Sequence, residues 1–149
     1  MRTMAELAGL RIVRVLDAPR ERVWAEWTRP ERFADWFGGV ESEIPVSSVS
    51  MDVRRGGAWR ATMFAGPGRR EIQWKGEYLE VDEPGRLTFT ISDRPDRDEV
   101  ELVTVVLTDL GGGRTEMLVE QRGHMTPEQY RRTEQGWSGF LDRMVERLA

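Results

Sequence analysis

The C-terminal segment, TPEQYRRTEQGWSGFLDRMVERLA, limits what this chain can fold into more than any other part of the sequence. Thr126, Pro127 and Gln129 form a helix-start signal, with a capping threonine, a proline at the first helical position and a capping box. Beyond them, residues recur at steps of three and four, which places them on one stripe of a helix. The stripe consists of Tyr130, Thr133, Trp137, Phe140, Leu141, Met144 and Leu148. An isolated amphipathic helix must bury such a stripe, so the rest of the chain has to supply a surface for it.

The first third of the chain predicts one strand followed by two short helices. Residues 10–16 alternate in the manner of a strand, and Asp17-Ala18-Pro19 ends it and opens a helix over residues 19–28. A second short helix follows Pro30 and carries Phe33, Trp36 and Phe37. It ends at Gly38-Gly39, because glycine reverses the chain without steric cost.

From residue 46 onward the pattern changes from helical to β. Successive runs with residues alternating at a spacing of two are separated by turns rich in glycine, proline and aspartate. Because these turns are short, six strands form one meander with antiparallel pairing. The polar segment 92–98 is expected to be a mobile loop. The predicted strands are residues 10–16, 46–53, 58–64, 71–81, 87–91, 99–108 and 115–121.

A meander of this kind has one apolar face and one solvated face, and the three helices can cover the apolar one. The sequence therefore predicts an α+β helix-grip fold. Its antiparallel curled sheet has six to seven strands, two short helices and one long C-terminal helix packed across it. All 149 residues are expected to form a single domain with its core in residues 10–148, since the length suits one hydrophobic core.

Several segments, in this order, resemble a known family. They are DAPRERVWAEWTRPERFADWF at residues 17–37, Gly57 with a strand after it, and KGEYLEVDEPGRLTFT at residues 75–90. A glycine turn before Thr115 and Gly136-Trp137 in the final helix complete the set. Together they resemble the START-like (SRPBCC) superfamily with its helix-grip, Bet-v-type fold. Within it they are similar to the branch homologous to the activator of the ninety-kilodalton heat-shock protein ATPase.

The resemblance implies a cavity between the long helix and the sheet that is usually apolar. The superfamily includes lipid and hormone carriers, polyketide cyclases and co-chaperone domains, and a shared fold does not choose among them. We expect about half of the large apolar residues to be plain core, and Trp137 and Phe140 to line the cavity. Gln121 shares a strand face with Met117 and Val119, which makes it the best candidate for an inward polar contact. The candidate ligand-binding residues are Trp59, Met63, Trp74, Phe89, Met117, Gln121, Tyr130, Trp137, Phe140 and Met144.

Gly136 and Gly139 flank Trp137 inside the predicted helix, where each costs about 1 kcal/mol relative to alanine. Glycine at these positions indicates that the sheet or a ligand approaches the helix closely there, or that the helix bends. The middle of the helix is therefore a candidate part of the site.

His124 is the only histidine and lies just before the final helix. Histidine titrates near neutral pH, so it is a weak candidate for a general acid or base, with a solvated loop residue as the simpler interpretation. Without cysteine, and with only one histidine, neither a structural metal site nor thiolate catalysis is predicted. Ser138 lies inside a helix, where it is not placed as the nucleophile of a triad. No cofactor is expected.

The composition narrows the range of partners. The net charge is −4 and no block of like charges occurs, which argues against nucleic acid as a partner. No apolar run approaches the ~18 residues of a membrane span, and the N-terminal residues lack the apolar stretch of a signal peptide. We therefore expect no membrane insertion, a cytoplasmic location, and a monomer or weak homodimer.

The leading hypothesis is a protein that binds a small hydrophobic molecule under the C-terminal helix and is not an enzyme. One alternative is a protein-interaction module that acts on a heat-shock chaperone ATPase, as in the stress response. The other is a small enzyme of the polyketide cyclase or dehydratase type.

Overall fold

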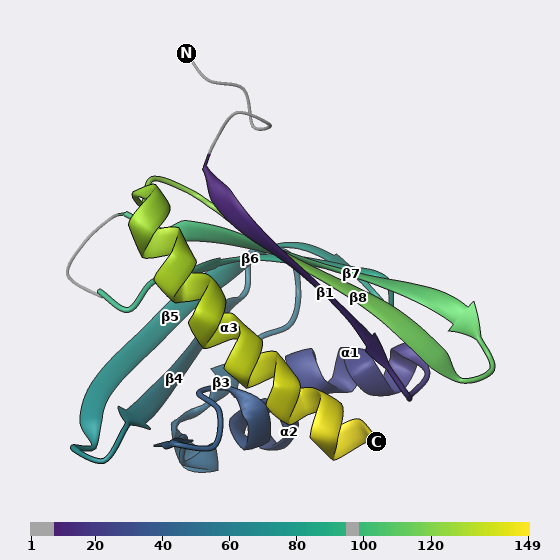
Figure 1. The fold of residues 1–149 in the computed structure, drawn as a ribbon, viewed down its shortest axis with the longest axis horizontal. Coiled ribbons are helices and arrows are strands. Elements are labelled where there is room, and N and C mark those ends of the chain that lie inside the picture. Colours follow the sequence, from purple (N-terminus) through teal and green to yellow (C-terminus); the bar gives the residue numbers. More distant parts are fainter. Residues whose placement is uncertain (1–7, 95–98) are drawn as a thin grey trace.

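The computed structural model describes residues 8–94 and 99–149, which form a curled sheet with three α-helices (Figure 1). The helices are α1 (Arg20–Thr28), α2 (Pro30–Trp36) and α3 (Pro127–Leu148), with one 3-10 turn, η2 (Val46–Ser48). The strands are β1 (Gly9–Leu16), β2 (Ser42–Glu43), β3 (Ser50–Met51), β4 (Ala58–Ala65), β5 (Arg70–Asp82), β6 (Arg86–Ile91), β7 (Glu101–Gly111) and β8 (Arg114–Arg122).

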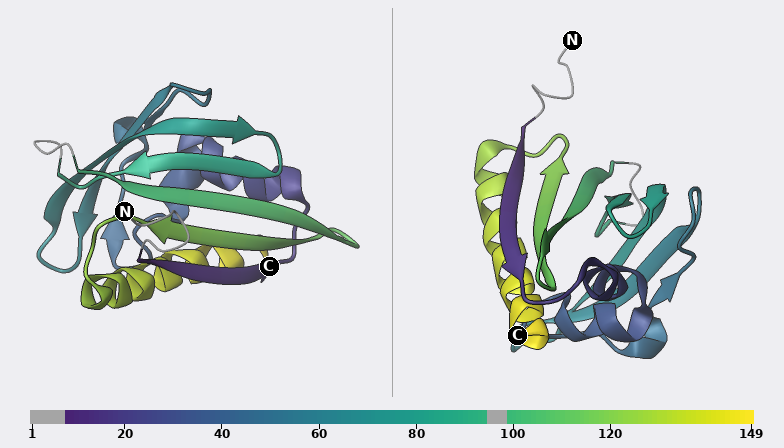
Figure 2. Two further views of the ribbon diagram at one scale, coloured as in Figure 1. Left: turned by 90° about the horizontal axis from the view of Figure 1, so that it is seen from above. Right: turned by 90° about the vertical axis from the view of Figure 1, so that its right-hand side faces the viewer.

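Every strand pairing in the sheet is antiparallel, which confirms the predicted α+β helix-grip fold. The strand order is β1-β8-β7-β6-β5-β4-β2, and β3 also pairs with β4. Strands β4 to β8 form the predicted meander, whereas β1 crosses over to pair with β8. Figure 2 shows the result, a sheet curled so that one wall carries β1 and α3 and the opposite wall carries β4 and β5.

Helix α3 begins where the sequence predicts. The Thr126 side chain accepts from the Gln129 backbone N–H, and the Gln129 side chain accepts from the Thr126 backbone N–H, which completes the capping box. The helix packs chiefly on β1, and an ion pair of 3.3 Å joins Arg14 of that strand to Asp142. Its buried residues are Tyr130, Trp137, Leu141, Met144 and Leu148. The predicted stripe thus faces the interior, with Phe140 and Thr133 only partly buried.

Helices α1 and α2 close the lower end of the curled sheet and contribute rings to the core (Figure 2). Trp27 lies 4.7 Å from Trp36 and 6.0 Å from Trp137 between ring centroids. Its indole N–H donates to Met117 Sδ at 3.4 Å, and the Trp36 N–H donates to the backbone oxygen of Glu26 at 2.8 Å. These contacts leave the centre of the fold densely filled.

Strand β5 changes partner in its middle, and this divides the sheet. Residues 70–77 of β5 pair with β4, and pairing with β6 begins only at Tyr78. Gly76 stands at the crossing, where a Cβ atom would overlap Thr90 O and Trp59 Nε1. The Trp59 indole donates to Thr90 O at 3.0 Å at the same point. Beyond it, only the isolated bridge between Lys75 and Ser92 joins the first half of β5 to the strands on its other side.

The single strand predicted at residues 46–53 is wrong. Residues 46–48 form η2, and only Ser50–Met51 is a strand. The Ser48 hydroxyl donates to Pro45 O at 2.7 Å and accepts from the Thr62 N–H at 3.1 Å. A serine that satisfies nearby backbone groups in this way competes with strand pairing. The polar loop predicted at 92–98 falls partly outside the described residues, because residues 95–98 are not among them.

Candidate functional site

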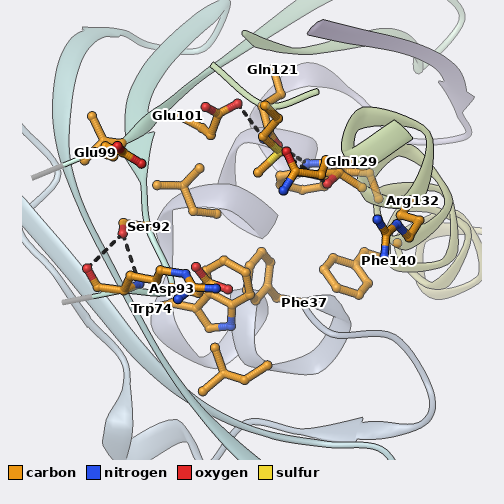
Figure 3. Close-up of a pocket in the computed structure, with 18 of the residues that line it drawn as sticks. Phe37, Trp74, Ser92, Asp93, Glu99, Glu101, Gln121, Gln129, Arg132 and Phe140 are labelled. Atoms are coloured by element: carbon orange, nitrogen blue, oxygen red, sulfur yellow. Dashed lines mark hydrogen bonds between the residues drawn. The ribbon is translucent and has the colours of Figure 1, made fainter. Parts of the chain in front are cut away.

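A cavity of about 560 Å³ lies between α3 and the divided part of the sheet. Its walls come from the first half of β5, the end of β6, the start of β7, the end of β8, the segment before α3 and the first half of α3 itself (Figure 3). The lining residues are Phe37, Arg70, Ile72, Trp74, Ile91, Ser92, Asp93, Arg94, Glu99, Val100, Glu101, Gln121, His124, Met125, Gln129, Arg132, Thr133, Gly136, Trp137 and Phe140. A pocket of this size suits a small organic molecule.

The apolar part of the pocket is built mainly from aromatic rings with Phe37 at their centre. Phe37 lies 5.5 Å from Trp74 at an interplanar angle of 84°, 5.2 Å from Phe140 at 57° and 6.0 Å from Trp137 at 72°. Such steep angles direct the electropositive edge of one ring toward the electronegative face of another. The rings are therefore held in place by one another before any ligand arrives.

The opposite end of the pocket is a hydrogen-bond network centred on Glu101. Its Oε1 accepts from the Tyr130 hydroxyl at 2.7 Å and from Gln121 Nε2 at 3.2 Å, and its Oε2 accepts from the His124 backbone N–H at 3.1 Å. Gln121 Oε1 in turn accepts from the Trp137 indole at 2.8 Å. This network links β7, β8 and α3 and fixes the polar end of the site.

Tyr130 keeps its proton in this network. Burial, reinforced by the hydrogen bond and the charge of Glu101, raises the pKa of the Tyr130 hydroxyl well above its ordinary value. The hydroxyl therefore acts as a donor to Glu101 over the whole physiological range of pH. A carboxylate that already accepts from three donors is held as part of the wall.

Trp74 contributes the only buried side-chain nitrogen or oxygen among the described residues that lacks a hydrogen-bond partner, its indole Nε1. In Figure 3 its ring lies on the pocket wall beside Phe37 and across from Phe140. An unsatisfied buried donor costs about 1–3 kcal/mol. The pocket wall thus includes a buried donor whose hydrogen-bonding capacity is unused.

Gly136 lines the pocket, and of the alternatives that the sequence left open for Gly136 and Gly139, a close approach of the sheet to the helix does not occur. A Cβ atom at either position would meet no atom within 4 Å. At Gly136 that open space belongs to the pocket, whereas Gly139 is solvent-exposed and is not part of the lining. The glycine at 136 therefore preserves free volume in the cavity.

The pocket brings together four of the residues that the sequence suggested for ligand binding, namely Trp74, Gln121, Trp137 and Phe140. Gln121 is buried, as its strand face indicated. The exposed residue His124 lies at the rim, where its backbone N–H bonds Glu101. Six others lie in the packed core outside the lining: Trp59, Met63, Phe89, Met117, Tyr130 and Met144. These six side chains are packed in the core because the cavity lies to one side of it, next to the first half of β5.

Sequence reasoning missed Glu101 and most of the pocket rim. Glu101 shares its strand face with the buried residues Val103, Val105 and Leu107, so the alternation of β7 contained the signal. Ile72 and Trp74 similarly share a face of β5. No local signal identified Phe37, because its place in the pocket depends on how α2 meets the sheet.

No helix within residues 8–94 and 99–149 combines the length and hydropathy of a transmembrane segment. Over the same residues, no cluster of three or more histidine, aspartate or glutamate side chains is placed to hold a metal ion.

A curled antiparallel sheet that grips a long C-terminal helix over a side pocket defines a helix-grip protein of the START-like superfamily. The family described as "Activator of Hsp90 ATPase homolog 1-like protein" matches residues 17–149. The chain belongs to this family.

Solved structures with similar folds come from several organisms. A protein from Chromobacterium violaceum is 25% identical with a TM-score of 0.83, covering 94% of this chain and 96% of that chain. The AHSA1 protein from Silicibacter pomeroyi is 22% identical with a TM-score of 0.82, covering 95% and 97% respectively. An HSP90 activator from Plasmodium falciparum is 17% identical with a TM-score of 0.69, covering 91% and 92%. A search of curated proteins finds no match.

Proposed function

We propose that this protein binds a small hydrophobic molecule in the pocket between α3 and the divided sheet. The observation that carries the proposal is the 560 Å³ cavity itself, which remains open in a fold whose centre is otherwise filled. Its aromatic wall supplies apolar contact area, and its polar end around Glu101 supplies fixed hydrogen-bonding groups. A concave site that combines apolar walls with placed polar groups is typical of small-molecule binding.

The test is a screen of apolar compounds against ¹⁵N-labelled protein, observed at the six tryptophan indole resonances. Binding in the pocket should shift the Trp74 and Trp137 resonances more than those of Trp24 and Trp36, which are buried in the core and are not part of the lining. Gly136→Leu should strongly reduce the shifts, because its side chain occupies part of the cavity next to Trp137.

Gly139→Leu is the matched control, because its side chain also enters open space but outside the lining. If no compound class shifts Trp74 or Trp137, or if both leucine variants behave alike, ligand binding in this pocket is refuted.

The family match over residues 17–149 favours a second function, the activation of a heat-shock chaperone ATPase. In that case the surface of the domain, and not its cavity, would make the important contacts. The test measures ATP hydrolysis by the ninety-kilodalton chaperone of the same cell with and without this protein. Stimulation that survives Gly136→Leu would support the chaperone function and separate it from ligand binding, whereas no stimulation would eliminate it.

A further inference from the structure

From the geometry of the pocket we infer the chemical class of its occupant, an inference that rests on the ligand-binding function proposed above. The occupant is a rigid aromatic molecule that carries a hydrogen-bond acceptor, such as an aryl ketone, and the acceptor receives the indole N–H of Trp74. Three features of the described residues lead to this conclusion.

The first feature is the arrangement of rings around the free volume. Phe37 meets Trp74, Phe140 and Trp137 at angles between 57° and 84°, so ring edges and faces alternate along the wall. An aromatic guest extends this edge-to-face pattern, whereas an alkyl chain gains only the contact area. A rigid ring also loses less conformational freedom on binding than a flexible chain does.

The second feature is the Trp74 nitrogen. It is the one orphaned buried polar side-chain atom within the described part of the chain, and its indole forms part of the pocket wall. Solvent does not reach the nitrogen in the empty protein. An acceptor therefore reaches the nitrogen only when the Trp74 side chain shifts, and the hydrogen bond that then forms offsets part of the cost of that shift.

The third feature is the position of Trp74 at the division of the sheet. Its strand segment, residues 70–77, pairs with β4 on one side, and on the other side the isolated bridge between Lys75 and Ser92 joins it to the segment after β6. By contrast, Trp59 and Trp137, on the neighbouring elements, donate to Thr90 O and Gln121 Oε1. The cavity thus lies where the sheet divides, and the Trp74 indole beside it has no hydrogen-bond partner.

The test compares three probes by titration, namely 2-acetylnaphthalene, its isostere 2-isopropenylnaphthalene, and 1-decanol. The ketone and the alkene have the same shape, and only the ketone accepts a hydrogen bond. We expect the ketone to bind about fivefold more tightly than the alkene, as one net hydrogen bond predicts. The ketone should also shift the Trp74 indole proton downfield, and decanol should bind most weakly.

Trp74→Phe keeps a ring in the wall and removes the donor. This variant should retain the affinity for the alkene, which shows that it is folded with an open pocket, and lose the preference for the ketone. Equal binding of ketone and alkene to the wild type, or a preference that survives in Trp74→Phe, would overturn the role of the donor. Binding of decanol alone would overturn the aromatic class while leaving the ligand-binding function intact. If none of the probes binds and a wider screen also fails, both proposals fall together.

Discussion

Glycine inside a helix is unfavourable, so its position is informative when no neighbouring atom requires it. Gly136 and Gly139 both meet open space on α3, but they face different surroundings. Gly136 faces the cavity and Gly139 faces solvent. Glycine at position 136 lowers helix stability. This cost is therefore explained only if the free volume that Gly136 leaves in the cavity serves ligand binding.

Replacing each glycine by alanine separates stability from binding. Gly136→Ala and Gly139→Ala should each raise the free energy of unfolding by up to about 1 kcal/mol, because alanine favours the helix. Only Gly136→Ala should weaken ligand binding, since its methyl group enters the pocket. Urea denaturation and titration of the same compound check the two effects. Equal loss of affinity in both variants would contradict a pocket role for Gly136.

Tyr130 offers a prediction about pH. Its pKa is raised in the folded protein by burial and then by Glu101, while the unfolded chain has a tyrosine pKa of about 10. The folded state therefore holds this proton more tightly, so the stability it contributes is complete below pH 10 and is lost as the pH rises toward the folded pKa.

Tyr130→Phe should accordingly cost about 1.5–3 kcal/mol at pH 7, the range for a hydrogen bond to a charged group. Its deficit relative to the wild type should shrink between pH 10 and pH 11, because phenylalanine does not titrate. Urea denaturation of both proteins at pH 7, 10 and 11 measures the difference. A deficit that stays constant with pH would contradict the inference that the Tyr130–Glu101 bond depends on this proton.

Among the elements, α3 is anchored at its C-terminal end by an ion-pair cluster. The Glu26 side chain is fully buried and meets Arg147 at 3.1 Å, and Arg147 also meets Asp35 at 3.0 Å. One residue of α3 thereby joins α1 and α2. The N-terminal part of α3 lines the pocket. The C-terminal end of the helix therefore anchors it to α1 and α2, and the N-terminal part forms the site.

Arg147→Met should leave the Glu26 charge buried without its main partner and lower the free energy of unfolding by about 3 kcal/mol. Arg143→Met on the same helix is the control. Its ion pair with Glu146 is 3.9 Å long and solvent-exposed, so it should cost less than about 1 kcal/mol. Thermal or chemical denaturation distinguishes the two, and similar losses would argue against the anchor.

Local patterns predicted most elements because their causes are local. The cap at Thr126, the periodicity of α3 and the alternation of β7 each depend on residues close together in the sequence. The strand predicted at 46–53 failed because Ser48 bonds the backbone of Pro45 and Thr62. The position of the pocket was not predictable in the same way. It depends on where β5 changes partner, which is set by the contact of Gly76 with Trp59 and Thr90, distant in sequence.

For the whole molecule, the cavity is an unfilled space beside an otherwise dense interior. A sheet that divides at Gly76 leaves one side of α3 without a strand beneath it, and β1 holds the other side. An occupant of the pocket would supply the missing contacts. The proposed ligand binding should therefore be coupled to folding, because a ligand that binds only the folded chain stabilises it.

This coupling yields a last prediction. A compound present at 100 times its dissociation constant should add about 2.7 kcal/mol to the free energy of unfolding. For a chain of this size that corresponds to a rise in Tm of about 5–10 °C. Gly136→Leu should show a much smaller rise with the same compound, and Gly139→Leu should show the full rise.

Hydrogen exchange locates the effect within the molecule. The ligand should slow amide hydrogen exchange most in the first half of α3 and in residues 70–74 of β5, which line the pocket. Local opening of these segments exposes the site, and a bound ligand opposes it. The last turn of α3, anchored by Arg147, should change little. Uniform protection along α3 would mean that the ligand stabilises the fold from elsewhere, and the pocket would then not be the binding site.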